Sequence, residues 1–588
     1  MRNETAPKAA LASLAVALVV VIAWALPRTI QPGDAGELAT VMITGGVPHP
    51  PGYPWMRMLG PLARLGLQLG LPAASAAALP CALLGAAGWV WIASSIARLC
   101  PWPIATGTVF FVACAHVVVL HACDAEVWGP LVLAIAAIVD LAIRRDRPAW
   151  LVGVVFGAAL AVHLTVLWLL PLVVCAAWPA APHDRAPRAI AVAGATGVLG
   201  TLVGLLVFAT LAIGDTDAPW RWGELDSTAG LVRHVLRSDY GTFDLSLHDS
   251  RPSTMAQLGR AATTWVGAWS AGLLAHPAWA LPIVAVVIVA TRTTWPSTRR
   301  DLAIALATAW LMCAVAFPLL HDIDPTSPFG AWILERFDIM PLVLSTIPLA
   351  LAITAIGPAL RPSLRTLARV AAAAAIAQQL LSTATRGIPS DDDAIEVYAR
   401  DVLRTPDPAR RAIVIGTDDH RTFPVLFAQS VLGEGPRVVY IDASLLAHPW
   451  YRAALRRRMP ELPDVDKPVK LVMALRSTPE HRDVAVYLAN DFSMPSTTLP
   501  RVPEGVLWRV LADDELTIGP DVVLSRHQSA IGRLVGPPRR NDDPDAPPAT
   551  PFAADLAAAW YRPSVQLAAA LRRAGRPDLA ALVPDPAR

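Results

Sequence analysis

Two carboxylates and a histidine lie close together in the segment that follows the first apolar run. The strings PGDAGEL and VPHPPGYP place Asp34 three residues before Glu37 and put His49 among prolines that rule out a continuous helix. If the first string is helical, both carboxylates share one face. A carboxylate beside apolar helices can act as a general base, because burial raises its proton affinity. The same spacing also fits a capping box with Asp34 as the helix cap and Glu37 as its partner, so spacing alone leaves both interpretations open.

The chain as a whole has the composition of a membrane protein rather than that of a soluble enzyme. Its 588 residues are 54% hydrophobic and 16% charged, with a mean hydropathy of +0.46, whereas soluble domains carry about a quarter charged residues. The 49 basic and 47 acidic residues nearly cancel, so the charge gives no reason to expect a nucleic-acid partner. The six cysteines lie in or beside apolar runs without a CxxC pair. This pattern predicts small buried side chains and neither a disulfide framework nor a metal site.

The apolar runs of the first 385 residues predict a polytopic helical membrane domain of about eleven spans. Single spans are expected at residues 9–26, 73–98, 101–120, 126–143, 189–213, 276–292, 301–320, 337–357 and 365–384. The run at 149–178 is too long for one upright span, so we expect two shorter helices that meet at His163. In one long tilted helix, His163 would instead be buried in the bundle and only hydrogen-bonded. No small-residue cleavage site follows the first run, and we expect a retained helix rather than a signal peptide.

Basic residues predict the orientation of this domain, because loops on the cytoplasmic side carry an excess of Lys and Arg. With eleven spans and a cytoplasmic N-terminus, the basic loops at residues 144–147, 183–188, 292–300 and 361–369 all fall on that side. The opposite face receives the PGDAGEL segment together with Asp124 and Glu126 and the loops at 214–253 and 321–336. We therefore expect the C-terminal part of the chain on the extracytoplasmic face.

Beyond the membrane domain (residues 1–385), the polarity of the chain is ordinary and three further units are expected. Residues 386–535 alternate strand-like runs at 412–415, 437–441 and 470–473 with helices that begin near 423 and at 444, which predicts an α/β domain. Asp418 and Asp419 end the first strand and fit a solvated turn better than a metal-binding pair. Residues 536–551 are rich in proline and charge and predict a linker. Residues 552–588 predict a helical pair, similar to one tetratricopeptide unit, that packs on the α/β domain or on a partner.

The strings DAGEL and HPPGYP resemble the signature of a bacterial membrane family, the domain of unknown function 2723, which is related to the eukaryotic transmembrane protein O-mannosyltransferase. Further similar segments follow in order: DAEV at 124–127, GAALAVHLT at 157–165, RSDYGTF at 237–243, ERF at 335–337, GTDDHRTFP at 416–424, and LL and WY between 445 and 451. The similarity covers residues from about 30 to 455. It departs at Asp419 and His420, where relatives usually carry Asn-Asp, so a catalytic role is not carried over to this pair.

The resemblance implies a GT-C type glycosyltransferase that takes a sugar from a polyprenyl-phosphate carrier at the extracytoplasmic face and inverts the anomeric centre in one displacement. It implies that Asp34 is the base for the acceptor hydroxyl and that Glu37 orients the acceptor or shares the proton. Mannose is the sugar that the family suggests, with Ser or Thr of a protein as the acceptor; a glycan or a lipid acceptor stays open. The expected partners are thus the lipid carrier and the acceptor, in a bacterial inner membrane. No cofactor is implied beyond the lipid-linked donor, and a divalent metal stays open.

Four cationic or polar side chains are candidates for the donor phosphate under the same resemblance. Arg336 and Arg237 can each make a bidentate contact with phosphate oxygens, and His49 and His163 can donate to them as well. Arg336 could instead pair only with its neighbours in the ERFD string, and Arg237 could be merely solvated. The candidates for the substrate groove are Tyr53, Glu126, Asp239, Tyr240 and Glu335.

A secondary transporter or flippase of lipid-linked sugars is the alternative class. Such a protein also has many spans, broken helices and ionisable residues within the membrane. Against this alternative, the charged residues of the membrane half cluster at one face and the sequence has no internal repeat.

Overall fold

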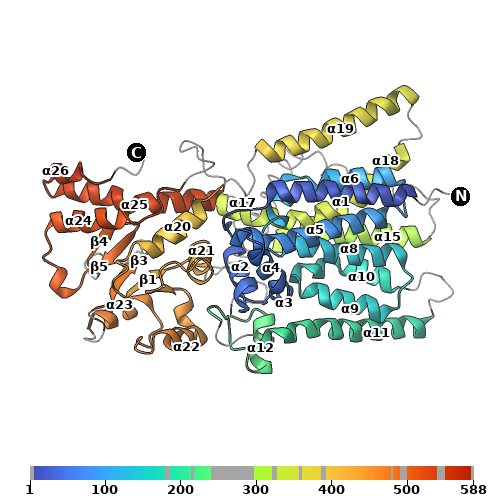
Figure 1. The fold of residues 1–588 in the computed structure, drawn as a ribbon. Coiled ribbons are helices and arrows are strands. Elements are labelled where there is room, and N and C mark those ends of the chain that lie inside the picture. Colours follow the sequence, from blue (N-terminus) through green and yellow to red (C-terminus); the bar gives the residue numbers. More distant parts are fainter. Residues whose placement is uncertain are drawn as a thin grey trace.

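The computed structural model joins a bundle of apolar helices to an α/β domain at one end of the bundle (Figure 1). It describes residues 5–178, 186–213, 218–239, 297–320, 323, 327–356, 361–385, 392–477, 481, 483–489, 499–538 and 550–584. The predicted span at 276–292, Tyr240 and most of the predicted linker lie outside these residues.

Four helical segments of the described residues are long and apolar enough to cross a membrane, and they indicate an integral membrane protein. They are Lys8–Ala25, Ala73–Ile96, Pro187–Ile213 and Pro328–Ala355. A fifth span results if α6 (Trp102–Ala113) and α7 (His116–Ala122), which meet at an angle of 71°, count as one. The predicted number of about eleven spans is therefore not confirmed, whereas the first apolar run forms the expected helix α1 (Thr5–Ala25).

The other helices of the bundle are shorter than a full span or less apolar. They are α8 (Trp128–Arg144), α9 (Ala149–Leu160), α10 (Leu170–Ala177), α15 (Ser297–Leu311) and α19 (Pro362–Thr385). Helix α9 ends just before His163, and the 3-10 helix η1 (Leu164–Leu169) leads from there into α10. The prediction of two shorter helices that meet at His163 is thus confirmed.

Helices α9 and α11 (Pro187–Leu205) pack against each other through glycines. A Cβ atom on Gly153 would lie 2.0 Å from the carbonyl oxygen of Gly197, and one on Gly157 would lie 2.2 Å from that of Thr201. Small residues at such spacing let two helix backbones approach closely within a membrane. The glycines therefore allow α9 and α11 to pack closely along the side of the bundle.

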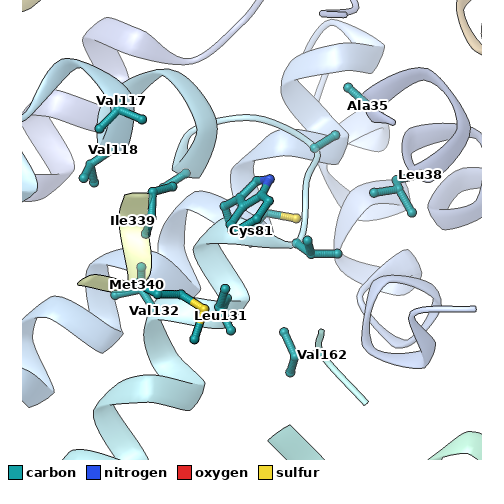
Figure 2. Packing of buried hydrophobic residues seen from close by; sticks show 14 of the residues in the cluster. Ala35, Leu38, Cys81, Val117, Val118, Leu131, Val132, Val162, Ile339 and Met340 are labelled. Atoms are coloured by element: carbon teal, nitrogen blue, oxygen red, sulfur yellow. The ribbon is translucent and has the colours of Figure 1, made fainter. Parts of the chain in front are cut away.

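One buried hydrophobic core joins residues from several helices of the bundle (Figure 2). Ala35 and Leu38 of α2 (Ala35–Thr44), Cys81 of α5 (Ala73–Ile96) and Leu131 of α8 belong to one buried cluster, which also contains Ile339. All six cysteines are buried and unpaired, as their positions in apolar runs predicted.

The C-terminal domain contains a five-stranded sheet of order β2-β1-β3-β5-β4. Strand β1 (Ala412–Gly416) pairs in parallel with β2 (Val438–Asp442) and β3 (Ala485–Leu488). Strand β5 (Leu507–Val510) is antiparallel to both β3 and β4 (Arg501–Glu504). This arrangement confirms a small α/β sheet.

Two predictions for the C-terminal part are wrong. Residues 470–473 are not a strand but part of helix α23 (Pro468–Ser477), whose Leu471, Val472 and Leu475 face the core at helical spacing. The expected helical pair is one long helix, α25 (Pro551–Arg573), followed by the single turn α26 (Pro577–Ala580). Helix α25 packs on α20 (Ala394–Arg404) and β4, so its expected docking on the α/β domain is confirmed.

The α/β domain docks on the first loop of the membrane domain. Helix α21 (Asp419–Ser430) lies against α2, and a Cβ atom on Gly36 would meet the carbonyl oxygen of Phe423 at 2.6 Å (Figure 1). The Thr29 hydroxyl donates to the Asp392 carbonyl over 2.7 Å, and the Ile30 amide donates to Glu396 over 3.1 Å. Gly36 is therefore required for close packing between the two parts of the chain.

Candidate functional site

Asp34 is the residue immediately before α2, but its carboxylate does not cap the helix. The cap position has no side-chain hydrogen bond, and the Asp34 amide donates to Oε1 of Glu126 over 3.0 Å instead of to Glu37. The capping-box interpretation is therefore wrong. The Asp34 side chain is 23% exposed, so its carboxylate is left accessible at the edge of the bundle.

Glu37 is fully buried and holds His49 in place. Its Oε1 accepts from the His49 amide over 2.8 Å and from the Trp220 indole over 2.7 Å, and its Oε2 lies 2.5 Å from Nδ1 of His49. All of these partners come from the HPPGYP loop and from the WRW string at 220–222. Sequence reasoning missed Trp220, although two tryptophans in a polar loop are a signal that could have been noticed.

His49 carries a positive charge at neutral pH because of its acidic surroundings. Burial on its own would lower the pKa of the imidazole, but the charges of Glu37 and Asp34, the hydrogen bond with Glu37 and the charge of Asp419 outweigh burial and raise the pKa to about 9. The site therefore holds an imidazolium next to the Asp34 loop.

An aromatic row leads from His49 into the bundle. The Tyr53 hydroxyl lies 3.5 Å from Nε2 of His49, and the Tyr53 ring stacks on His163 with 5.9 Å between centroids. Nδ1 of His163 accepts from the Thr165 amide over 3.2 Å, so the neutral ring carries its proton on Nε2. The ring of Trp128 follows at 5.4 Å from His163. His49, Tyr53 and His163 are thus brought together as the sequence predicted.

Arg336 lies beside Asp34, and its Nε donates to the Ile333 carbonyl over 3.2 Å. Its Nη1 is 3.7 Å from Oδ2 of Asp34 and 3.5 Å from Oε1 of Glu126. The guanidinium carbon lies 5.9 Å from the Trp128 ring centroid and 5.7 Å from that of Trp332, at cation–π distance. Pairing of Arg336 with Glu335 or Asp338 is therefore not observed among the described residues.

Glu126 connects Asp34 with Arg336 and is only 3% exposed. One of its oxygens accepts from the Asp34 amide and faces Arg336, and the other has no hydrogen-bond partner in the described part of the chain. Burial and the charge of Asp34 raise the pKa of Glu126 to about 8, although Arg336 acts in the opposite direction. Gly33 leaves room for this contact, since a Cβ there would lie 3.2 Å from the Glu126 oxygen.

The other predicted site residues have different surroundings in the structure. Arg237 acts electrostatically on Tyr53, where it opposes the larger effects of burial and of Asp34 that raise the pKa of the phenol. Asp239 pairs with Arg233, with 3.3 Å between Nη2 and Oδ1. Glu335 lies 3.2 Å from Nε2 of His121. Tyr240 falls outside the described residues, so its role as a groove residue stays a prediction.

The α/β domain contributes side chains that sequence reasoning did not assign to the site. Phe423 of α21 stacks on His49 with 6.0 Å between centroids, and Asp419, one helical turn earlier on the same face, is exposed. His420 points to α25 instead, where it lies 3.1 Å from Asp555. In the described part of the chain, no group of three or more His, Cys, Asp or Glu side chains could hold a metal ion.

The site places the accessible Asp34 carboxylate beside the Arg336 guanidinium. The imidazolium of His49 and the Nε2–H donor of His163 lie next to them. A carboxylate can accept a proton from a hydroxyl, and the cations can stabilise a phosphate that leaves.

No family model matches the chain. Its sequence is 23% identical, over 466 residues, to the protein O-mannosyl-transferase TMEM260 of Mus musculus. The chain is similar to a protein O-mannosyltransferase.

The aligned part is 75% of this chain and 64% of the mouse protein, so the chain spans less than two thirds of that relative's length. Two solved structures of ArnT from Cupriavidus metallidurans are also similar, each with 14% sequence identity. The structure bound to undecaprenyl phosphate has a TM-score of 0.40 and covers 77% of this chain and 95% of ArnT. The apo structure has a TM-score of 0.45 and covers 84% and 96%.

Proposed function

We propose that the chain is a membrane glycosyltransferase of the GT-C type, which moves a sugar from a polyprenyl-phosphate carrier to an acceptor hydroxyl. The similarity to a protein O-mannosyl-transferase supports this class and suggests mannose as the sugar and a protein Ser or Thr as the acceptor. The apolar helices fit a donor that is itself a membrane lipid.

One observation carries the proposal: the Asp34 carboxylate is accessible, makes no cap bond and lies within 3.7 Å of Arg336. A carboxylate whose only role was to cap the helix would accept a hydrogen bond from an amide of the first turn. An accessible carboxylate and a cation side by side are what proton removal and phosphate departure each require.

The chemistry is a single displacement. The acceptor oxygen attacks the anomeric carbon while its proton moves to the Asp34 carboxylate, and the bond between that carbon and the phosphate oxygen breaks. The electron pair leaves with the polyprenyl phosphate, and the configuration at the anomeric carbon inverts. Arg336, with Arg237 and the Nε2–H of His163, would stabilise the charge that develops on the phosphate.

Glu37 acts through His49 in this proposal and not on the acceptor directly. It is fully buried and both of its oxygens have donors, so no oxygen is left for a substrate hydroxyl. The imidazolium it holds lies between the Asp34 loop and the α/β domain, where it adds a further positive charge near the phosphate.

We also propose that the site faces the extracytoplasmic side, with the N-terminus and the basic loops in the cytoplasm of a bacterium. The start of α9 and the start of α11 lie at the end of the bundle away from the α/β domain (Figure 1). The basic residues 144–147 belong to that end, and the positive-inside rule assigns it to the cytoplasm.

The test is transfer of labelled sugar from a polyprenyl-phosphate donor by proteoliposomes that contain the full chain. Transfer to Ser- or Thr-containing peptides that is lost with Asp34→Asn would support the proposal. Movement of the intact donor across the bilayer without transfer, unaffected by Asp34→Asn, would instead support a flippase.

A further inference from the structure

An open pocket lies at the end of the bundle opposite Asp34. It has a volume of about 670 Å³ and is formed where α9 and α11 begin and α10 ends. Arg147 and Arg188 are its charged lining residues, with no acidic residue among the described side chains that line it. Apart from Thr196, its other described lining residues are small or apolar, among them Ala177, Val192 and Ala193.

The mouth of this pocket favours an anion for two independent reasons. Two guanidinium groups line it, and two helices direct their N-terminal ends at it. The residues at the cap positions are Pro148 and Ala186, whose side chains have no acceptor atom, so no side chain caps either helix. Free amide groups at a helix N-terminus together with arginines are suited to a phosphate.

The neighbouring basic residues have other partners. Arg145 is buried and lies 3.1 Å from Asp301, and Arg144 lies 3.2 Å from Asp146. Arg147 also contacts Asp146, over 3.4 Å, and no ion-pair partner of Arg188 occurs among the described residues. Among the described residues, the lining of the pocket therefore carries a net positive charge, most of it on Arg188.

The wall of the pocket continues onto an exposed apolar surface of α11. Helix α11 belongs to the apolar span Pro187–Ile213, and only 22% of the most apolar part of that span is buried. Its exposed side chains include Val192, Val198, Leu199, Leu202 and Val203. A ligand with a phosphate in the mouth could therefore lay an acyl chain along α11.

We infer that this pocket binds the headgroup of an anionic glycerophospholipid. Basic pockets between transmembrane helices bind such headgroups in other membrane proteins. A phospholipid would also contact the apolar wall through its acyl chain, whereas a free phosphate would not. The site does not depend on the proposed transferase activity, because its residues lie at the opposite end of the bundle from Asp34.

The test uses the full chain, purified and delipidated, with retention of added lipid measured by native mass spectrometry. We expect phosphatidylglycerol to be retained and phosphatidylcholine with the same acyl chains to be lost. The double variant Arg147→Ala/Arg188→Ala should weaken phosphatidylglycerol binding about 30-fold, which corresponds to about 1 kcal/mol for each arginine near the surface. The matched control, Arg361→Ala/Arg369→Ala, removes two exposed arginines that do not line the pocket and should leave binding unchanged.

Two further arms separate a phospholipid from other phosphates. Ala193→Phe should fill the apolar wall and weaken phosphatidylglycerol without changing the weak binding of inorganic phosphate. Equal retention of both phospholipids, or no effect of the double arginine variant, would overturn the inference. Competition by inorganic phosphate at the same concentration, or tighter binding of undecaprenyl phosphate than of phosphatidylglycerol, would likewise assign the pocket to another ligand.

Discussion

The guanidinium of Arg336 lies 3.7 Å from the Asp34 carboxylate, and Glu126 holds both residues. The Asp34 amide donates to the same Glu126 oxygen that Arg336 faces, so the position of one residue determines that of the other. In the absence of a donor, the positive charge of Arg336 is satisfied by the two carboxylates. If Arg336 binds the donor phosphate as proposed, the phosphate would engage a cation that faces Asp34 in this structure, and the Asp34 carboxylate would be left for the acceptor hydroxyl.

The first prediction concerns the Asp34 carboxylate. Asp34→Asn keeps the size of the side chain and removes no cap bond, because the Asp34 carboxylate does not cap α2, so the variant should fold and insert normally. Because an amide cannot take the proton, the rate of sugar transfer should fall by about 10²–10⁴-fold while binding of the labelled donor persists. Transfer kinetics and filter retention of the donor measure the two quantities. Asp226→Asn is the matched control, since Asp226 is 78% exposed and pairs with Arg221; a near-normal rate in Asp34→Asn would end the general-base assignment.

The second prediction concerns the phosphate contact of Arg336. Arg336→Lys keeps the charge but loses the bidentate contact with the phosphate, so we expect transfer to need a higher donor concentration. Arg336→Ala removes the charge as well, and the rate should fall by about 10²–10³-fold. The dependence of the transfer rate on donor concentration is the measurement. Arg233→Ala, which removes an arginine that is 69% exposed, should leave that dependence as it is. If both Arg336 variants also behave like the wild type, Arg336 does not bind the phosphate.

Much of the site could be predicted from the sequence because its members lie at the ends of apolar runs on one face of the membrane. Asp34, His49, His163 and Arg336 share that face by topology alone, and the structure brings them together. Phe423 could not be predicted in the same way. Its contact with His49 depends on how the α/β domain docks on α2, and a tertiary contact of this kind leaves no periodic pattern in the sequence.

One error in the fold has its physical origin in a short apolar run. Residues 470–473 are apolar enough for a buried strand, but a run of this length is equally compatible with the buried face of a helix. The number of spans is not confirmed for a different reason: several apolar helices of the bundle are shorter than a full span, and the run at 276–292 lies outside the described residues. Helix α8, for example, has only 17 residues and is still buried within the bundle.

The third prediction tests the packing of the α/β domain on the first loop. Gly36→Ala would place a Cβ atom 2.6 Å from the Phe423 carbonyl oxygen, so the backbones must separate. We expect a loss of about 1–3 kcal/mol in stability, measured as a lower Tm in detergent, together with reduced transfer because His49 loses its contact with Phe423. Gly107→Ala is the matched control, because a Cβ on this helical glycine would meet nothing within 4 Å. Equal Tm values for the two variants would contradict the close contact.

The fourth prediction is a pH dependence that arises from His49. Its pKa is raised from 6.5 to about 9 in the folded protein, so between these values the folded state holds a proton that the unfolded state has released. The contribution of His49 to stability is therefore complete below pH 6.5, decreases as the pH rises and is lost above about 9. The slope is at most about 1.4 kcal/mol per pH unit for one proton. The difference in Tm between the wild type and His49→Gln, measured across this range, isolates the effect; a difference that stays constant with pH would rule it out.

The last prediction is topological: the α/β domain and the basic loop after α8 lie on opposite sides of the membrane, with the α/β domain outside. Arg147 and Arg456 are matched probes, because each side chain is 46% exposed and the six native cysteines are buried. In intact cells, a membrane-impermeant maleimide should label Arg456→Cys but not Arg147→Cys, and Arg147→Cys should be labelled only after permeabilisation. The unsubstituted chain, which should remain unlabelled, is the control. The reverse pattern would place the basic loop outside against the positive-inside rule, and the Asp34 site would then have to draw its donor from the cytoplasmic leaflet.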